Sequence, residues 1–184
     1  MKVVQKAKNF LVNPYSAFDK EKKTKMSEAF KYTLVLSLVT SIISAIINLS
    51  FNFTLAIQGF FATYLGILFL NIIWWLWLHL ISYILGVRRG MEQTFKVVFY
   101  GNTPLYLFSW VCLGTSFNYF LGSLGLILLS VLIIWSILNH FTGLKKLHGI
   151  STSRAVIIMI ISLILPIIFL VFGGSLYFSL ESVS

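Results

Sequence analysis

The sequence predicts an all-α membrane protein, a polytopic bundle of five transmembrane helices with a cytoplasmic N-terminus. Of the 184 residues, 58% are hydrophobic and only 10% are charged, whereas a soluble domain has about 45–50% apolar and about 25% charged residues. The mean hydropathy is +0.92. The basic residues are confined to three short segments between long uncharged apolar stretches. These observations exclude a soluble enzyme, a disordered chain and a coiled coil.

Residues 1–28 are expected to form a cytosolic amphipathic segment. A helix over 1–13 would carry lysines on one face and an apolar face opposite, formed by Val3, Val4, Ala7, Phe10 and Leu11. Such a helix lies on a membrane surface, so the first predicted partner is an anionic lipid surface. Asn13 and Pro14 are typical of a helix cap followed by a first-turn proline, and they predict a second short helix at about 14–22.

Residues 29–175 are expected to form the transmembrane domain, which begins with spans at about 29–50 and 56–86. The first span has a stripe of small polar side chains on one face, Ser37, Ser41, Ser44 and Asn48. Small residues on one face favour close helix packing within a membrane. The alternative is that this face lines a path for a solute.

The third span, about 94–115, is expected to be kinked or broken at Gly101–Pro104. Pro104 cannot donate a hydrogen bond to the carbonyl of Tyr100, and Gly101 allows the backbone to leave helical geometry. The fourth span is expected at about 118–142, followed by a loop at 143–152. The fifth is expected at about 153–173, with a short external tail at 176–184.

Charge predicts the orientation of these spans. All fourteen basic residues fall in the first 31 residues and in the connections near 86–96 and 143–154, and the opposite side has none. Cytoplasmic loops are enriched in lysine and arginine. The N-terminus is therefore predicted inside and the C-terminus outside.

Three segments resemble the Yip family, the Ypt/Rab-interacting membrane proteins. They are NPYSAF (13–18), GVRRGMEQTFKVVFYGNTPLYL (86–107) and GLKKLHGISTSRAVIIMI (143–160). The resemblance implies a five-helix bundle, membrane trafficking or organisation, homo- or hetero-oligomers and contact with Rab-type GTPases. The short N-terminal region is similar to that of the prokaryotic branch, which implies a location in a prokaryotic cell membrane.

Polar side chains from three predicted spans fall in one layer inside the cytoplasmic boundary. Counting about 1.5 Å per residue from the helix ends brings together His79, Tyr100, Asn102, Asn139 and His140. One interpretation is a cytoplasm-facing polar pocket beside the broken helix. The other is a hydrogen-bond cluster that only packs the bundle.

No catalytic, cofactor-binding or metal-binding set is recognisable. The five acidic residues all lie outside the predicted spans, which disfavours a proton-coupled transporter. No spacing typical of a zinc protease or a phosphate loop occurs, and nucleic-acid binding is not expected. The sequence therefore favours a non-enzymatic scaffold or adaptor. The alternative function is a small channel or permease component that uses the polar pocket.

Overall fold

A computed structural model describes the backbone of residues 3–115 and 119–181, and the side chains of 3–111, 123–164, 167 and 168. This part of the chain is all-α and has no strand. The helices are α1 (Val3–Val12), α2 (Pro14–Glu21), α3 (Met26–Leu49), α4 (Phe53–Ile84), α5 (Met91–Gly101), α6 (Thr103–Thr115), α7 (Tyr119–His148) and α8 (Thr152–Glu181).

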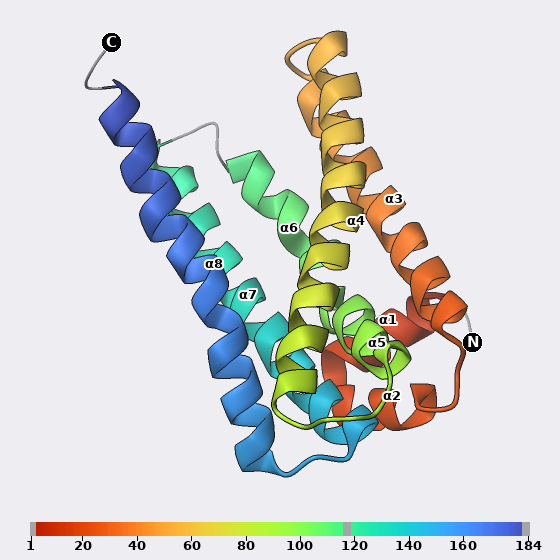
Figure 1. Ribbon diagram of the computed structural model, residues 1–184. Coiled ribbons are helices and arrows are strands. Elements are labelled where there is room, and N and C mark those ends of the chain that lie inside the picture. The colour runs from red at the N-terminus through yellow and green to blue at the C-terminus, as the bar shows by residue number, and fades with distance from the viewer. Residues whose placement is uncertain (1–2, 116–118, 182–184) are drawn as a thin grey trace.

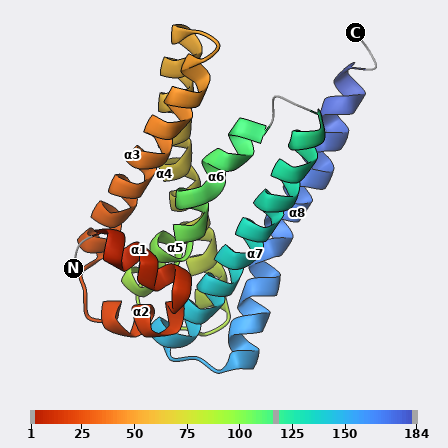
Figure 2. The same ribbon diagram turned by 180° about the vertical axis from the view of Figure 1, so that it is seen from behind.

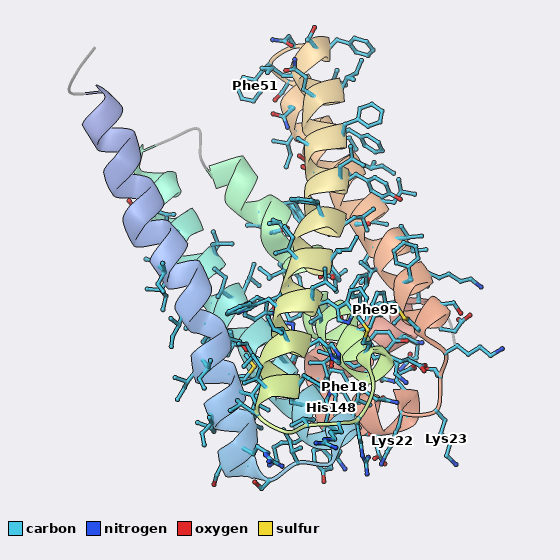
Figure 3. The ribbon with its side chains drawn as sticks, viewed as in Figure 1. Phe18, Lys22, Lys23, Phe51, Phe95 and His148 are labelled. Atoms are coloured by element: carbon cyan, nitrogen blue, oxygen red, sulfur yellow. The ribbon has the colours of Figure 1, made fainter. Side chains whose placement is uncertain are left out.

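Two long helical hairpins, α3–α4 and α7–α8, flank the shorter helix α6 (Figures 1 and 2). The short helices α1, α2 and α5 lie together at one end of the bundle, where the α4–α5 and α7–α8 connections are also found. We call this the basic end, because all the basic segments meet there. Figure 3 shows Lys22, Lys23 and His148 at this end and Phe51 at the opposite tip.

Three helices in the described part are long and apolar enough to cross a membrane: Met26–Leu49, Phe53–Ile84 and Ser123–His148. At about 1.5 Å per residue, each exceeds the roughly 30 Å of a bilayer's hydrocarbon core. The predicted third span corresponds to two helices, α5 and α6, and the predicted fifth to α8. The all-α class is confirmed, whereas the count of five spans stays a prediction.

The last two helices, α7 and α8, end at later residues than expected. The prediction of a loop at 143–152 is wrong for its first half. Helix α7 continues to His148, and Leu144 and Leu147 are buried in the basic end. Gly149 then ends the helix with a φ of 64°, a conformation that favours glycine. Helix α8 passes the expected end at 173 and reaches Glu181. The expected tail is therefore helical up to that residue, and 182–184 lie outside the described residues.

The N-terminal helices belong to the core of the bundle. Their boundaries agree with the sequence pattern, and the Asn13 side chain caps α2 by accepting a hydrogen bond from the Ser16 amide at 3.1 Å. Ala7 and Phe10, however, are buried among residues of the main core. The apolar face expected on a membrane surface is thus divided: its middle packs against the bundle, while Val4 is 80% exposed.

Helix α5 is the centre of the basic end. All of its residues from Thr94 to Gly101 are buried. A helix that is covered on every side must satisfy its polar groups inside the protein. The partners of those groups define the candidate site.

Candidate functional site

The α5–α6 segment is broken at Asn102, inside the predicted interval. Asn102 leaves helical geometry with φ −79° and ψ 7°, and its amide donates back to the carbonyls of Val98 and Tyr100. Pro104 falls in the first turn of α6, where a missing N–H is least costly. The two helices point in different directions (Figure 1). The predicted break is confirmed.

Side chains from three helices satisfy the carbonyl groups around the break. Thr33 of α3 donates to the Phe99 carbonyl at 3.1 Å, and Thr103 donates to the Tyr100 carbonyl at 2.6 Å. Asn139 of α7 donates to the Gly101 carbonyl at 3.4 Å. Unpaired backbone groups are costly at membrane depth, so these contacts fix the break in place. The sequence reasoning identified Asn139 as a donor and missed both threonines.

Gly101 serves a different purpose from the expected one. It is the last residue of α5, and the only described positive-φ residues are Gly86 and Gly149. A Cβ at Gly101 would lie 2.7 Å from Cδ2 of His140. Position 101 therefore requires a glycine because α7 approaches α5 closely there. The backbone of Gly101 itself stays in the helix.

A buried charged network attaches the N-terminal helices to α5. Lys6 Nζ lies 2.9 Å from Glu21 Oε2, and the Tyr100 hydroxyl donates to the same oxygen at 2.9 Å. Lys6 also lies 3.3 Å from the Tyr100 hydroxyl. The Phe10 ring stacks on Tyr100 at 4.7 Å and meets Phe18 edge-on at 4.9 Å. We call Lys6, Glu21 and Tyr100 the N-terminal clamp.

The clamp corrects two expectations. The sequence pattern predicts that Lys6 lies on the exposed basic face of the first helix, but its side chain is only 11% exposed. One interpretation of the sequence predicts Tyr100 in a cytoplasm-facing pocket, but its side chain is fully buried and contacts α1 and α2. The reason is Glu21, whose buried carboxylate requires a cation and donors. The local sequence does not show that this acidic residue is internal.

Lys96 is a second basic residue inside the protein. Its side chain is 1% exposed, and its ammonium group donates to the carbonyls of Lys22 and Thr24 at 3.1 and 3.0 Å. Glu92 lies 3.6 Å away. Lys96 therefore holds the turn between α2 and α3 against α5, in addition to being one of the charges expected at the membrane surface.

The other predicted pocket residues belong to separate groups. His79 Nδ1 lies 3.2 Å from the Thr94 hydroxyl, which also lies 3.2 Å from Nε2 of His148. Asn102 donates to Asn71 at 2.8 Å. The Tyr106 hydroxyl donates to the same Asn71 oxygen at 2.6 Å.

The structure does not gather the five predicted residues into one cytoplasm-facing pocket. Tyr100 belongs to the clamp, His79 pairs with α5, Asn102 pairs with α4, and Asn139 joins α7 to the break. His140 packs beside Gly101, and its ring contacts the backbone of Val98 and Ser136. The sequence reasoning missed Asn71, although it is a polar residue inside the long apolar stretch that forms α4.

The second half of the polar stripe on α3, at Ser44 and Asn48, contacts α4. Ser37, Ser41 and Ser44 are buried, and Thr63 donates to the Ser44 hydroxyl at 3.2 Å. A Cβ at Gly59 would lie 2.6 Å from Nδ2 of Asn48. This geometry is that of two helices in close contact, which is the packing interpretation of the stripe.

One protein-family profile matches most of this chain. The profile described as the Yip1 domain matches residues 8–174, from α1 into α8. No curated protein and no solved structure matches the chain. Among the residues that the structure describes, no three histidine, cysteine or acidic side chains lie close enough to hold a metal ion.

Proposed function

Because the chain belongs to the Yip1 domain family, we propose that this membrane protein works as a non-enzymatic scaffold or adaptor in trafficking or membrane organisation. The observation that carries the proposal is the N-terminal clamp. It fixes α1 and α2 to the bundle through a 2.9 Å ion pair between Lys6 and Glu21. The N-terminal helices therefore present a pre-organised surface, and a pre-organised surface loses less entropy when a partner binds.

We propose that the basic end faces the cytoplasm and that the chain crosses the membrane five times. The α4–α5 and α7–α8 connections lie at the same end as α1 and α2 (Figure 1). Arg88, Arg89 and Arg154 are exposed there. An arrangement with three basic segments on one side follows the positive-inside rule.

The surface offered by the clamped helices combines apolar and basic side chains. Val4, Val12 and Tyr15 are 80, 76 and 58% exposed. Two exposed lysines, Lys8 and Lys20, lie on the same two helices. This combination fits an anionic lipid surface, and it would use Val4 and Val12 rather than the buried Ala7 and Phe10.

Protein partners are proposed for the same surface. Family membership supports homo- or hetero-oligomers in the membrane and, more remotely, contact with a GTPase. The channel or permease alternative has less support. Asn102 and His140 line one cavity between α4, α6, α7 and α8, but the wall of that cavity is mostly apolar, and His79, Tyr100 and Asn139 do not line it. A continuous polar path would need them to line one space.

Site-specific photocrosslinking of the full-length protein in its native membrane tests the adaptor proposal. A photoreactive amino acid at Val12 should form adducts with one recurring protein, identified by mass spectrometry and recovered in a reciprocal purification. The same amino acid at Phe69, which is 64% exposed on α4, is the matched control and should yield lipid adducts. Adducts at Val12 with lipid alone would contradict the adaptor proposal.

A flux assay in proteoliposomes tests the alternative. Under the adaptor proposal, Asn102→Ala changes stability and leaves the permeability of the vesicles unchanged. Solute flux through the wild-type protein that Asn102→Ala abolishes, with the fold intact, would favour the channel.

A further inference from the structure

The α4–α5 and α7–α8 connections meet at the basic end and exchange arginine side chains. A Cβ added at Gly149, just after α7, would lie 3.3 Å from Nη1, 3.4 Å from Cζ and 3.5 Å from Nη2 of Arg89. A Cβ added at Gly86, just after α4, would lie 3.3 Å from Nη2 of Arg154. Each connection therefore has the guanidinium group of the other against its glycine. We call the place where the two connections meet the arginine crossing.

No described acidic side chain neutralises the arginine crossing. The four acidic side chains that the structure describes each pair with a lysine: Glu21 with Lys6 at 2.9 Å, Glu28 with Lys31 at 3.4 Å, Glu92 with Lys96 at 3.6 Å and Asp19 with Lys146 at 3.6 Å. Arg89 and Arg154 make no described ion pair. Like charges that are brought together repel each other. The fold therefore concentrates positive charge here without a described counter-ion.

The hydrogen-bond donors of these two side chains suit a phosphate group. Both arginines are exposed, neither guanidinium makes a described hydrogen bond, and Arg154 donates to Ser151 only through its backbone amide. A guanidinium group has five N–H donors in a planar fork, which matches two oxygens of one phosphate. Helices α5 and α8 also begin at the crossing, and the amides of a first helical turn favour an anion.

The arginine crossing lies at the edge of the apolar surface of the bundle. Ile84 is 67% exposed two residues before Gly86, and Ile157 is 49% exposed three residues after Arg154. These separations are about 3–5 Å along the helices, at about 1.5 Å per residue. The polar layer on each side of a bilayer is about 5–7 Å thick. When the isoleucines lie in hydrocarbon, the guanidinium groups therefore lie at the level of the lipid phosphates.

We propose that Arg89 and Arg154 together bind the phosphate of an anionic phospholipid such as phosphatidylglycerol, with its acyl chains along the exposed apolar residues of α4 and α8. Phosphatidylcholine carries a cation next to its phosphate, which the two guanidinium groups repel. Inorganic phosphate lacks the hydrocarbon that would contact Ile84 and Ile157. The site uses no residue of α1 or α2, so it is independent of the adaptor proposal and of the side that the basic end faces.

Native mass spectrometry of the full-length protein in a neutral detergent tests this site. Micelles of a neutral detergent have no charged surface, so binding reports a discrete site. Phosphatidylglycerol should bind about tenfold more tightly than phosphatidylcholine with the same acyl chains, which corresponds to roughly 1.4 kcal/mol. Inorganic phosphate at the same concentration should not displace it. In hydrogen–deuterium exchange, phosphatidylglycerol should slow the exchange of the backbone amides at 86–93 and 149–155.

Variants of the two arginines provide the second arm. Arg89→Gln together with Arg154→Gln should weaken phosphatidylglycerol binding about 30-fold, which corresponds to roughly 2 kcal/mol. Arg89→Lys together with Arg154→Lys should still weaken it several-fold, because an ammonium group lacks the planar fork. The matched control is Lys23→Gln together with Lys25→Gln, which removes the same charge from exposed positions at the basic end and should leave the affinity unchanged.

Four results would overturn the proposal. Equal affinity for the two lipids, or equal effects of the arginine and lysine pairs, would indicate only a general attraction to basic residues. Displacement by inorganic phosphate at the same concentration would indicate an anion site that does not require a lipid. Protection confined to α1 and α2 would place the lipid elsewhere. If the glutamine variant does not fold, the comparison of the two lipids and the exchange experiment on the wild-type protein still decide.

Discussion

Replacing Lys6 by methionine should release the N-terminal helices from the bundle. The substitution keeps most of the aliphatic stem and removes the ammonium group 2.9 Å from Glu21. The carboxylate of Glu21, whose side chain is 7% exposed, then keeps only the Tyr100 hydroxyl as a described hydrogen-bond partner and the more distant charge of Lys96. A buried charge without a counter-ion is strongly unfavourable.

The magnitude follows from the burial of the pair. Breaking a buried ion pair by removing one partner costs about 3–5 kcal/mol. Detachment of α1 and α2 returns Glu21 to water, which limits this cost. We therefore expect the free energy of local unfolding of residues 3–21 to fall by about 3 kcal/mol. Global unfolding of α3 to α8 should change little.

Hydrogen–deuterium exchange of the purified protein in detergent micelles measures this loss by segment. Lys6→Met should reduce protection in α1 and α2, whereas Lys8→Met, which removes an exposed lysine from the same helix, should not. The triple variant Lys6→Met, Glu21→Leu, Tyr100→Phe should recover most of the protection, because an apolar replacement of a buried ion pair is often neutral. Equal exchange in Lys6→Met and Lys8→Met, or no recovery in the triple variant, would refute the clamp.

The close approach of α5 and α7 predicts that Gly101→Ala lowers the free energy of unfolding by about 1–3 kcal/mol, since the new Cβ would lie 2.7 Å from His140. Gly66→Ala is the control: no atom lies within 4 Å of its added Cβ, so it should stabilise by up to about 1 kcal/mol. Thermal unfolding in micelles compares the two, and equal effects would contradict the account. Lys96→Met should destabilise by about 1–3 kcal/mol, because two turn carbonyls lose their donor. Lys20→Met, at an exposed position, should have almost no effect in denaturant titrations.

Much of the fold could be predicted because its signals are local. Long apolar stretches define α3, α4 and most of α7, and a proline three residues after a glycine locates the break within a few positions. Asn13 and Pro14 define the start of α2 through capping chemistry. Each of these features depends on neighbouring residues, so the sequence alone carries it.

The arrangement of the polar side chains could not be predicted in the same way. Lys6 and Glu21 are both polar residues on short helices, and nothing local distinguishes an internal pair from two exposed charges. Their burial depends on Tyr100, which is 79 residues from Glu21 in the chain. Counting residues from helix ends gives the depth of a side chain in the membrane, but not the direction in which it points. It grouped His79 with His140, although His79 faces Thr94 and His140 faces Gly101.

The central claim is that a clamped basic end faces the cytoplasm in a protein that crosses the membrane five times. Thiol labelling of single-cysteine variants in a Cys112→Ser background tests it most directly, with Ser50→Cys in the α3–α4 turn, Gly90→Cys in the α4–α5 connection, and Ser184→Cys. We expect an impermeant thiol reagent added to intact cells to label positions 50 and 184 and to leave position 90 unlabelled until the membrane is permeabilised. Labelling of position 90 from outside, or of positions 50 and 184 from opposite sides, would contradict the account.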